Sequence, residues 1–163
     1  MLRIAYFTLS IMMVAFISAC AMPPAEKPTP PAPAKRAIAA TELPAQAKAG
    51  YALIYVIRPS DEATLIKFNV FLDNQNADAE MGYTQAAQYI YFYVKPGRRR
   101  IWSKAENWAD VVVAAKPGEI IFLRQNPEVG YVISRNSLRK VDQKQGAQDL
   151  KRTSAGTMLK AFQ

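Results

Sequence analysis

The sequence predicts a mainly β fold, a small antiparallel β-sandwich or open barrel with a short C-terminal helix. Short runs of β-branched and aromatic residues recur between positions 51 and 135, a spacing typical of such architectures. Pro-Gly dipeptides separate two pairs of these runs, and Pro-Gly favours a tight turn because proline presets φ and glycine permits a positive φ. A polar segment then starts at Asp142, which can cap a helix that reaches Leu150.

Composition divides the chain of 163 residues into four segments. Residues 1–19 form a predicted signal peptide, and residues 20–49 a predicted acylated N-terminus with a Pro/Ala-rich tether. Residues 50–152 are the predicted β-rich domain, and residues 153–163 are a C-terminal tail expected to fray. A domain of about 100 residues can bury one modest core. Half of the chain is apolar, which excludes a protein that is disordered throughout.

The first 19 residues have the layout of a secretory signal. Arg3 supplies a positive charge, and residues 4–16 are apolar apart from Thr8 and Ser10. This run is shorter than the roughly 20 residues that span a bilayer as a helix. Cleavage is therefore favoured over the alternative, an uncleaved membrane anchor.

The single cysteine of the chain, Cys20, stands where the apolar run stops. The stretch Ile17-Ser18-Ala19-Cys20 resembles the bacterial lipobox, in which an aliphatic residue and two small residues precede a cysteine. The resemblance implies a lipoprotein cleaved before Cys20, with acyl chains such as palmitate on that residue. Two or three chains hold a protein firmly, whereas one chain binds a membrane only marginally. Ala21, in the place of an aspartate, implies the outer membrane, on the side that faces the periplasm.

Prolines concentrate in the segment that follows, between positions 22 and 49. Because proline lacks the N–H donor and fixes φ, no helix or sheet ladder is expected through residues 23–33. The composition predicts a semi-rigid polyproline II spacer that holds a domain away from a membrane. A polyproline ligand for a partner protein is the alternative interpretation.

Seven runs are predicted strands: residues 51–59, 67–73, 89–94, 100–105, 110–115, 119–125 and 130–135. The second run alternates, with Phe68, Val70 and Leu72 on one face. The fifth and sixth runs are apolar on both faces, which predicts a central, covered position for them. The helix that Asp142 caps contains Gly146, which costs a helix about 1 kcal/mol relative to alanine.

The Lys116-Pro117-Gly118-Glu119 turn predicts a hairpin between the fifth and sixth runs, and the Lys95-Pro96-Gly97-Arg98 turn predicts one between the third and fourth. A symmetric turn pairs Tyr93 with Arg100, Tyr91 with Trp102 and Tyr89 with Lys104, so that these six side chains share one aromatic and basic face. Such a face can bind a glycan, a peptide or another protein. In the alternative interpretation the rings pack under a second sheet or the C-terminal helix, and the cationic ends reach solvent.

The order of these segments resembles a family of small bacterial lipoproteins catalogued as domain of unknown function 2846. The resemblance covers roughly residues 51–150, and its stretches are Tyr51–Pro59, Val70–Asp73, Tyr91–Gly97, Gly118–Gln125 and Leu138–Leu150. Asn74-Gln75-Asn76 follows where related patterns have a glycine turn, and asparagine also tolerates the left-handed conformation. The resemblance implies a fold and an envelope location, and it implies no activity.

The residue inventory narrows the chemistry. The chain has no histidine and no cysteine besides Cys20, which excludes a disulfide, a His or Cys metal site and a Ser–His–acid triad in the domain. We therefore expect no catalytic residue, no enzyme activity, no metal and no cofactor. The net charge of +8 favours anionic partners, and for an envelope protein we interpret it as solvated surface and expect no nucleic acid.

The sequence thus predicts a lipoprotein of the cell envelope, attached to a membrane through acylated Cys20. Its expected role is that of a non-catalytic interaction or structural module with an envelope protein or glycan as partner. The alternative is a module that binds an anionic envelope glycan or lipid through the face of Tyr89, Tyr91, Tyr93, Arg100, Trp102 and Lys104.

Overall fold

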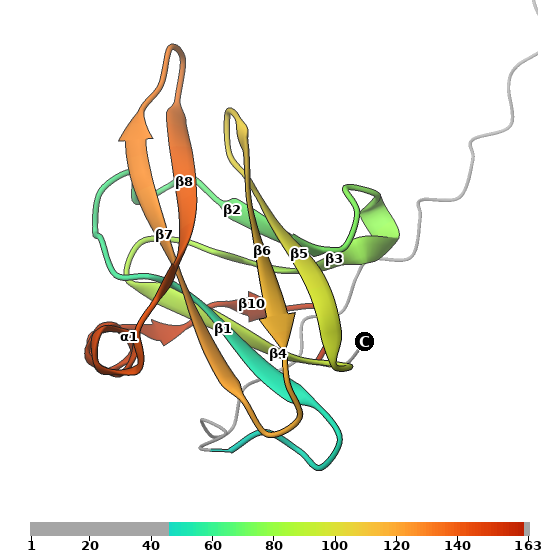
Figure 1. Ribbon diagram of the computed structural model, residues 1–163. Coiled ribbons are helices and arrows are strands. Elements are labelled where there is room, and N and C mark those ends of the chain that lie inside the picture. Colours follow the sequence, from blue (N-terminus) through green and yellow to red (C-terminus); the bar gives the residue numbers. More distant parts are fainter. Residues whose placement is uncertain (1–45, 162–163) are drawn as a thin grey trace, which may run out of the picture. The chain divides into compact units, whose positions relative to one another are not determined.

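The computed structural model describes residues 46–161. The predicted signal peptide, Cys20 and nearly all of the predicted tether lie outside the described residues. The described part contains two five-stranded sheets that face each other (Figure 1). The fold class predicted from the sequence, a β-sandwich with a short C-terminal helix, is confirmed.

Sheet B has the strand order β8-β7-β1-β4-β9, and sheet A has the order β10-β3-β2-β5-β6. Their bounds are β1 Ala52–Arg58, β2 Phe68–Leu72, β3 Glu80–Thr84, β4 Gln88–Val94, β5 Gly97–Lys104, β6 Trp108–Ala115, β7 Ile120–Val129, β8 Ser134–Val141, β9 Ser154–Ala155 and β10 Thr157–Met158. A 3-10 helix, η1, covers Ala77–Ala79, and the α-helix α1 covers Gln143–Leu150.

Strand β1 lies at the centre of sheet B, and all seven of its residues are buried. It pairs antiparallel with β4 and parallel with β7, so the sandwich is not purely antiparallel. A strand that is covered on both faces needs apolar side chains in both directions, which explains its nearly unbroken apolar sequence.

Both hairpins predicted at the Pro-Gly turns are wrong. Strands β4 and β5 belong to different sheets, and so do β6 and β7, so Pro96-Gly97 and Pro117-Gly118 mark crossings between the sheets. Gly97 and Gly118 have φ angles of 130° and 79°, so the turns use the freedom of glycine as expected. A sharp turn fixes a change of direction, but it does not decide whether the strands on either side pair. The hairpins of the structure are β2–β3, β5–β6 and β7–β8.

The last strands also differ from the expectation. Strand β8 begins at Ser134, whereas residues 130–133 of the seventh predicted run form the loop before it. The residues expected to fray contain β9, which pairs with β4 in sheet B, and β10, which pairs with β3 in sheet A. Gly82 in β3 permits this close approach, because a Cβ there would lie 2.2 Å from the backbone oxygen of Thr157.

The core between the sheets is apolar, with one polar chain across it. Thr84 of β3 donates to the side-chain oxygen of Gln125 on β7 at 2.6 Å, and the Gln125 amide donates to Ser103 of β5 at 2.8 Å. All three residues are buried. Each buried side-chain polar atom of these three residues has a partner, so their burial costs little. The hydrogen bonds between them fix how the two sheets align.

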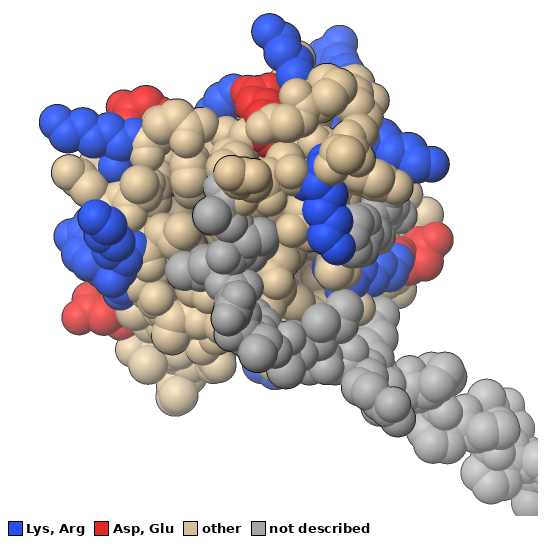
Figure 2. All heavy atoms as spheres, turned by 90° about the horizontal axis from the view of Figure 1, so that it is seen from below, with Lys and Arg blue, Asp and Glu red and all other residues tan. Residues whose placement is uncertain are grey.

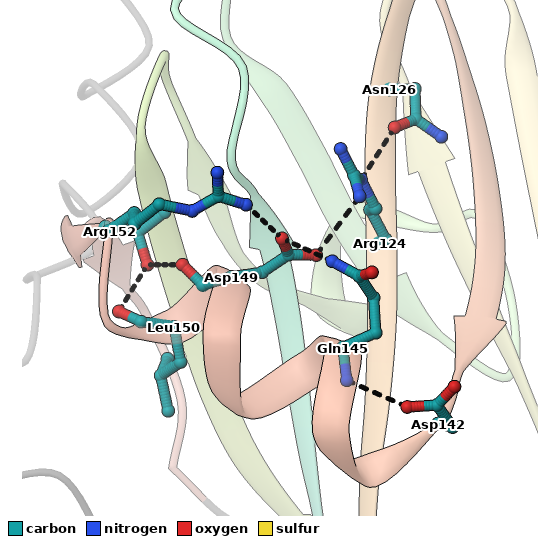
Figure 3. A network of polar contacts seen from close by, with 8 residues as sticks. Arg124, Asn126, Asp142, Gln145, Asp149, Leu150 and Arg152 are labelled. Atoms are coloured by element: carbon teal, nitrogen blue, oxygen red, sulfur yellow. Dashed lines mark hydrogen bonds and ion pairs between the residues drawn. The ribbon is translucent and has the colours of Figure 1, made fainter.

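Helix α1 covers the outer face of sheet B, as Figure 1 shows. Asp142 accepts a hydrogen bond from the Gln145 backbone N–H, which confirms the predicted N-cap. The buried carboxylate of Asp149 lies 3.4 Å from Arg124 of β7 and 2.8 Å from Arg152, and Gln145 donates to it (Figure 3). The contact with Arg124 ties the helix to sheet B.

Candidate functional site

The structure separates the six residues of the predicted face. Tyr89, Tyr91 and Tyr93 lie on β4 in sheet B. Arg100, Trp102 and Lys104 lie on β5 in sheet A. The predicted pairing across Pro96-Gly97 does not exist, because β4 pairs with β1 and β5 pairs with β2 and β6. The six side chains therefore do not form one surface.

The tyrosine row of β4 belongs to a packed cluster on the outer face of sheet B. Tyr89 and Tyr93 are 6% and 5% exposed, and Tyr55 of β1 lies between them and Phe122. The rings of Tyr55 and Phe122 stack with centroids 5.4 Å apart. Burial is the main cause that raises the pKa of the Tyr55, Tyr89 and Tyr93 hydroxyls. These rings mainly stabilise the contact between sheet B and the segments that cover it.

The other half of the predicted face lies on the outside of sheet A. Arg100, Trp102 and Lys104 alternate along β5 with the buried residues Ile101 and Ser103. The neighbouring strands add aromatic and charged side chains to the same side, because strand register places Phe71 opposite Trp102 and Trp108 opposite Lys104. We call this surface the aromatic face; its residues are Lys67, Phe71, Tyr83, Arg100, Trp102, Lys104, Trp108 and Asp110.

Three rings form the centre of the aromatic face. The centroid of Trp108 lies 5.2 Å from that of Phe71 and 6.2 Å from that of Trp102. The two indoles meet edge to face, with an interplanar angle of 84°. Both tryptophans are half-buried, and the buried Trp102 Nε1–H has no hydrogen-bond partner among residues 46–161. The cluster is thus a fixed apolar platform that still exposes ring surface.

Cationic groups stand over these rings. The guanidinium of Arg100 lies 5.3 Å from the Trp102 centroid, and the ammonium of Lys104 lies 5.0 Å from that of Trp108. A third pair, Lys67 over Tyr83, has a distance of 4.4 Å. Each such pair contributes roughly 0.5–1 kcal/mol at an exposed site. The cations are therefore held above the rings while their remaining N–H donors stay available.

Tyr83 has a second polar contact. A hydrogen bond with Thr157 of β10 is the main cause that lowers the pKa of its hydroxyl, and the nearby Lys67 adds to the effect. Asp110 is the acidic member of the aromatic face and lies 3.5 Å from Arg100. Lys67 and Lys104 form no ion pair within the part of the chain that the structure describes. The cations of the aromatic face therefore outnumber its carboxylate, and Glu80, opposite Phe71 in the strand register, adds a second carboxylate on the same side of sheet A.

Sequence reasoning found three of the eight residues of the aromatic face and missed the other five. The β5–β6 hairpin turns at residues 105–107, which contain neither proline nor glycine. The backbone N–H of Ala105 donates to the Asn107 oxygen at 3.0 Å and closes this turn. The alternation of Trp108, Asp110 and Val112 was the available signal, because it places a tryptophan on the polar side of a strand.

No group of three or more His, Cys, Asp or Glu side chains gathers within residues 46–161. No helix in this range is long and apolar enough to span a membrane. What the aromatic face offers chemically is stacking, cationic hydrogen-bond donors and one carboxylate, which together suit recognition of a ligand.

Comparisons with known proteins do not identify a relative. No family model, no curated protein and no solved structure matches this chain.

Proposed function

We propose that this chain is a lipid-anchored protein of the cell envelope whose β domain acts as a non-catalytic interaction module. The resemblance of residues 17–20 to a lipobox and the proline-rich segment behind it support an acyl anchor with a stalk. The absence of histidine from the whole chain and the lack of a clustered acidic site in residues 46–161 support a role in binding.

The unequal covering of the two outer sheet faces is the observation that carries this proposal. Sheet B packs its outer aromatic residues beneath α1 and beside the C-terminal segment. This segment reaches β4, where the Tyr93 backbone N–H donates to the Ala161 backbone oxygen at 2.8 Å. Within residues 46–161, no α-helix lies on sheet A, and its two tryptophans and Lys104 remain accessible. Half-buried tryptophans with adjacent cations are typical of binding surfaces.

An anionic envelope glycan or lipid is the second candidate ligand for the aromatic face. Three ring–cation pairs stand on this one surface, and sugar rings stack on indoles while anionic substituents pair with Lys and Arg. Positive charge is spread over the surface: in Figure 2 the lysines and arginines stand at separate places around the outline of one face, with acidic groups among them. Net charge alone therefore does not define a binding surface.

The anchor has a direct test. Intact-mass analysis of the mature protein purified from membranes should give a chain that starts at Cys20 and carries added mass for two or three acyl chains. A Cys20→Ser variant should lose this mass and leave the membrane fraction. A mature N-terminus elsewhere, or an unmodified Cys20, would contradict the proposed anchor.

Removal of the two lysines of the aromatic face should distinguish an anionic glycan or lipid from other ligands. We expect Lys67→Gln with Lys104→Gln to lower co-sedimentation of the full-length chain with peptidoglycan or lipopolysaccharide by about tenfold. This equals about 1.4 kcal/mol, which two exposed ion pairs between the lysines and anionic groups of the ligand can supply. Lys144→Gln with Lys151→Gln removes equal charge from exposed positions in α1 and just after it, and should change nothing. Equal losses in both variants would mean that only net charge matters and would reject the glycan assignment.

A further inference from the structure

The loop at the end of the β7–β8 hairpin exposes an unusual run of apolar side chains. We call residues 129–133 the apolar tip. Val129, Tyr131, Val132 and Ile133 are 95%, 92%, 87% and 55% exposed. The hairpin extends past the neighbouring strands at the top of Figure 1. Exposed single apolar residues are ordinary, but four large ones in five positions mark an interaction site.

The apolar tip is held in one conformation by a carboxylate from the other sheet. Glu106, in the turn between β5 and β6, accepts hydrogen bonds from the backbone N–H groups of Tyr131, Val132 and Ile133 at 3.0, 3.2 and 3.1 Å. These three bonds are the main cause that lowers the pKa of the Glu106 carboxyl. Three N–H donors around one anion form a backbone nest, so the apolar side chains are directed outward by a fixed loop.

Gly130 allows this arrangement. A Cβ at position 130 would lie 2.4 Å from a carboxylate oxygen of Glu106 and 3.1 Å from the Arg135 backbone nitrogen. The Glu106 backbone N–H also donates to the Ser134 oxygen at 3.1 Å, which joins the two turns a second time. A preorganised loop loses little conformational entropy on binding, which favours association.

A pocket lies directly beside the apolar tip. It has a volume of about 480 Å³ and is lined by Glu62, Ala63, Pro127, Glu128, Val129, Ile133 and Ser134. One wall is the loop after β1, whose carbonyl groups at positions 62 and 63 accept hydrogen bonds from Arg58 at 2.6 and 2.8 Å. A projecting apolar loop next to a fixed pocket can pack on a partner while it receives one of the partner's side chains.

The charges around this region indicate the chemistry of the partner. Three carboxylates, Glu62, Glu106 and Glu128, lie in the pocket or at the apolar tip. Two cations lie near them: Arg135, opposite Glu128 in the β7–β8 register, and the buried Arg58 behind the loop of residues 62 and 63, so the carboxylates are in excess by one. This corner is acidic although the chain as a whole carries a charge of +8. Acidic groups disfavour an anionic membrane surface and favour a partner with Lys or Arg beside its apolar residues.

The apolar tip and the start of β1 lie at opposite ends of sheet B. Strands β1 and β7 run parallel, with Leu53 opposite Ile120. The tip follows the far end of β7, whereas residue 46, where the described chain begins, precedes the near end of β1. The tip is therefore presented away from the point at which the predicted tether joins the domain.

We propose that the apolar tip and its adjoining pocket bind a protein partner through an apolar segment flanked by lysine or arginine. The four tip side chains pack on the apolar segment, one partner side chain enters the pocket, and Glu62 and Glu128 pair with the basic residues. This surface is independent of the aromatic face, and the proposal holds whichever ligand that face binds.

Photocrosslinking in native envelope membranes tests this proposal. Benzoylphenylalanine replaces Tyr131 in the full-length chain, and the same group at Lys144 of α1 serves as the control position. We expect position 131 to give an adduct with a protein segment that holds apolar residues and at least one Lys or Arg, and position 144 to give none. Glu62→Gln with Glu128→Gln should lower the adduct yield about tenfold, and Val132→Asp should abolish it, while both variants keep the parent melting temperature.

Other outcomes overturn the proposal. Adducts with lipid would assign the tip to a membrane, and adducts with a second copy of this chain would make it a dimer contact. A protein adduct whose yield ignores the loss of both carboxylates would remove the proposed charge recognition. No adduct at position 131 in folded protein would show that the tip contacts no partner in the envelope. None of these outcomes bears on the aromatic face, because the probe and the variants lie elsewhere.

Discussion

Replacement of Arg58 with methionine is expected to destabilise the domain by about 3 kcal/mol, since it leaves the partly buried Glu62 and Ile66 carbonyl oxygens without their side-chain donor. The Arg58 side chain is fully buried at the end of β1. Its guanidinium donates to the Ile66, Glu62 and Ala63 carbonyl oxygens at 2.7, 2.6 and 2.8 Å. It also lies 3.9 Å from the centroid of the Phe68 ring. One side chain thus fixes the loop between β1 and β2.

Opposing effects set the size of this loss of stability. An unsatisfied buried acceptor costs about 1–3 kcal/mol, and loss of a desolvated ring–cation contact about 2 kcal/mol. Removal of a buried charge, which no carboxylate among residues 46–161 neutralises, offsets part of this cost. Burial lowers the pKa of the Arg58 guanidinium for the same reason. Urea unfolding of the full-length chain measures the net change.

Two further variants control this prediction. Arg58→Lys keeps the charge but offers one ammonium in place of a planar fork, so we expect it to recover less than half of the loss. Arg139→Met removes an exposed arginine from β8 and should stay within about 0.5 kcal/mol of the parent protein. A methionine variant as stable as its parent would show that water replaces the guanidinium without cost.

Gly146→Val should have an effect of similar size, about 3 kcal/mol, through a steric conflict. A Cβ at position 146 would lie 2.2 Å from Cγ of Phe122 in β7, and 2.5 Å from its Cβ. Phe122 stacks on Tyr55, so its ring has little room to move. Overpacking of this kind costs about 1–3 kcal/mol or more. The helix must shift away from β7 and β1, which would expose Phe122 and Tyr55 to solvent.

Ala147→Val is the matched control for this change. It adds similar bulk at the next position of α1, where the side chain is exposed. We expect it to cost no more than about 0.7 kcal/mol, from helix propensity alone. Thermal unfolding and iodide quenching of tyrosine fluorescence measure stability and exposure together. If both valine variants unfold alike, the contact between Gly146 and Phe122 does not govern how α1 packs.

Local pattern in the sequence was sufficient for the fold class and for most element positions. Strands β1, β2 and β4 and the helix α1 all coincide with predicted segments, because their apolar patterns and the Asp142 cap act locally. Strand pairing was not predictable, since a turn at Pro-Gly serves a hairpin and a crossing between sheets equally well. Strands β9 and β10, with two residues each, carry no pattern and are defined by their partners.

The prediction of the candidate site depended on strand pairing, which the sequence does not determine. Alternation correctly placed Arg100, Trp102 and Lys104 on one side of a strand, because side chains in a strand alternate whatever the partner is. The assignment of the tyrosine row to that side required β4 to pair with β5, which it does not. The apolar tip was hidden for a related reason: Tyr131, Val132 and Ile133 look like strand residues until Glu106 of the other sheet binds their backbone.

Photocrosslinking at the aromatic face in native envelope membranes tests the central claim most directly. Benzoylphenylalanine at Val112, which β6 places opposite Arg100, should give a discrete adduct with an envelope protein or glycan. The yield should fall about tenfold when Lys67→Gln and Lys104→Gln are combined with it. Benzoylphenylalanine in place of Arg139 on β8 should give no such adduct. Equal labelling from both positions, or none from position 112 in folded protein, would contradict the assignment of sheet A as the binding surface.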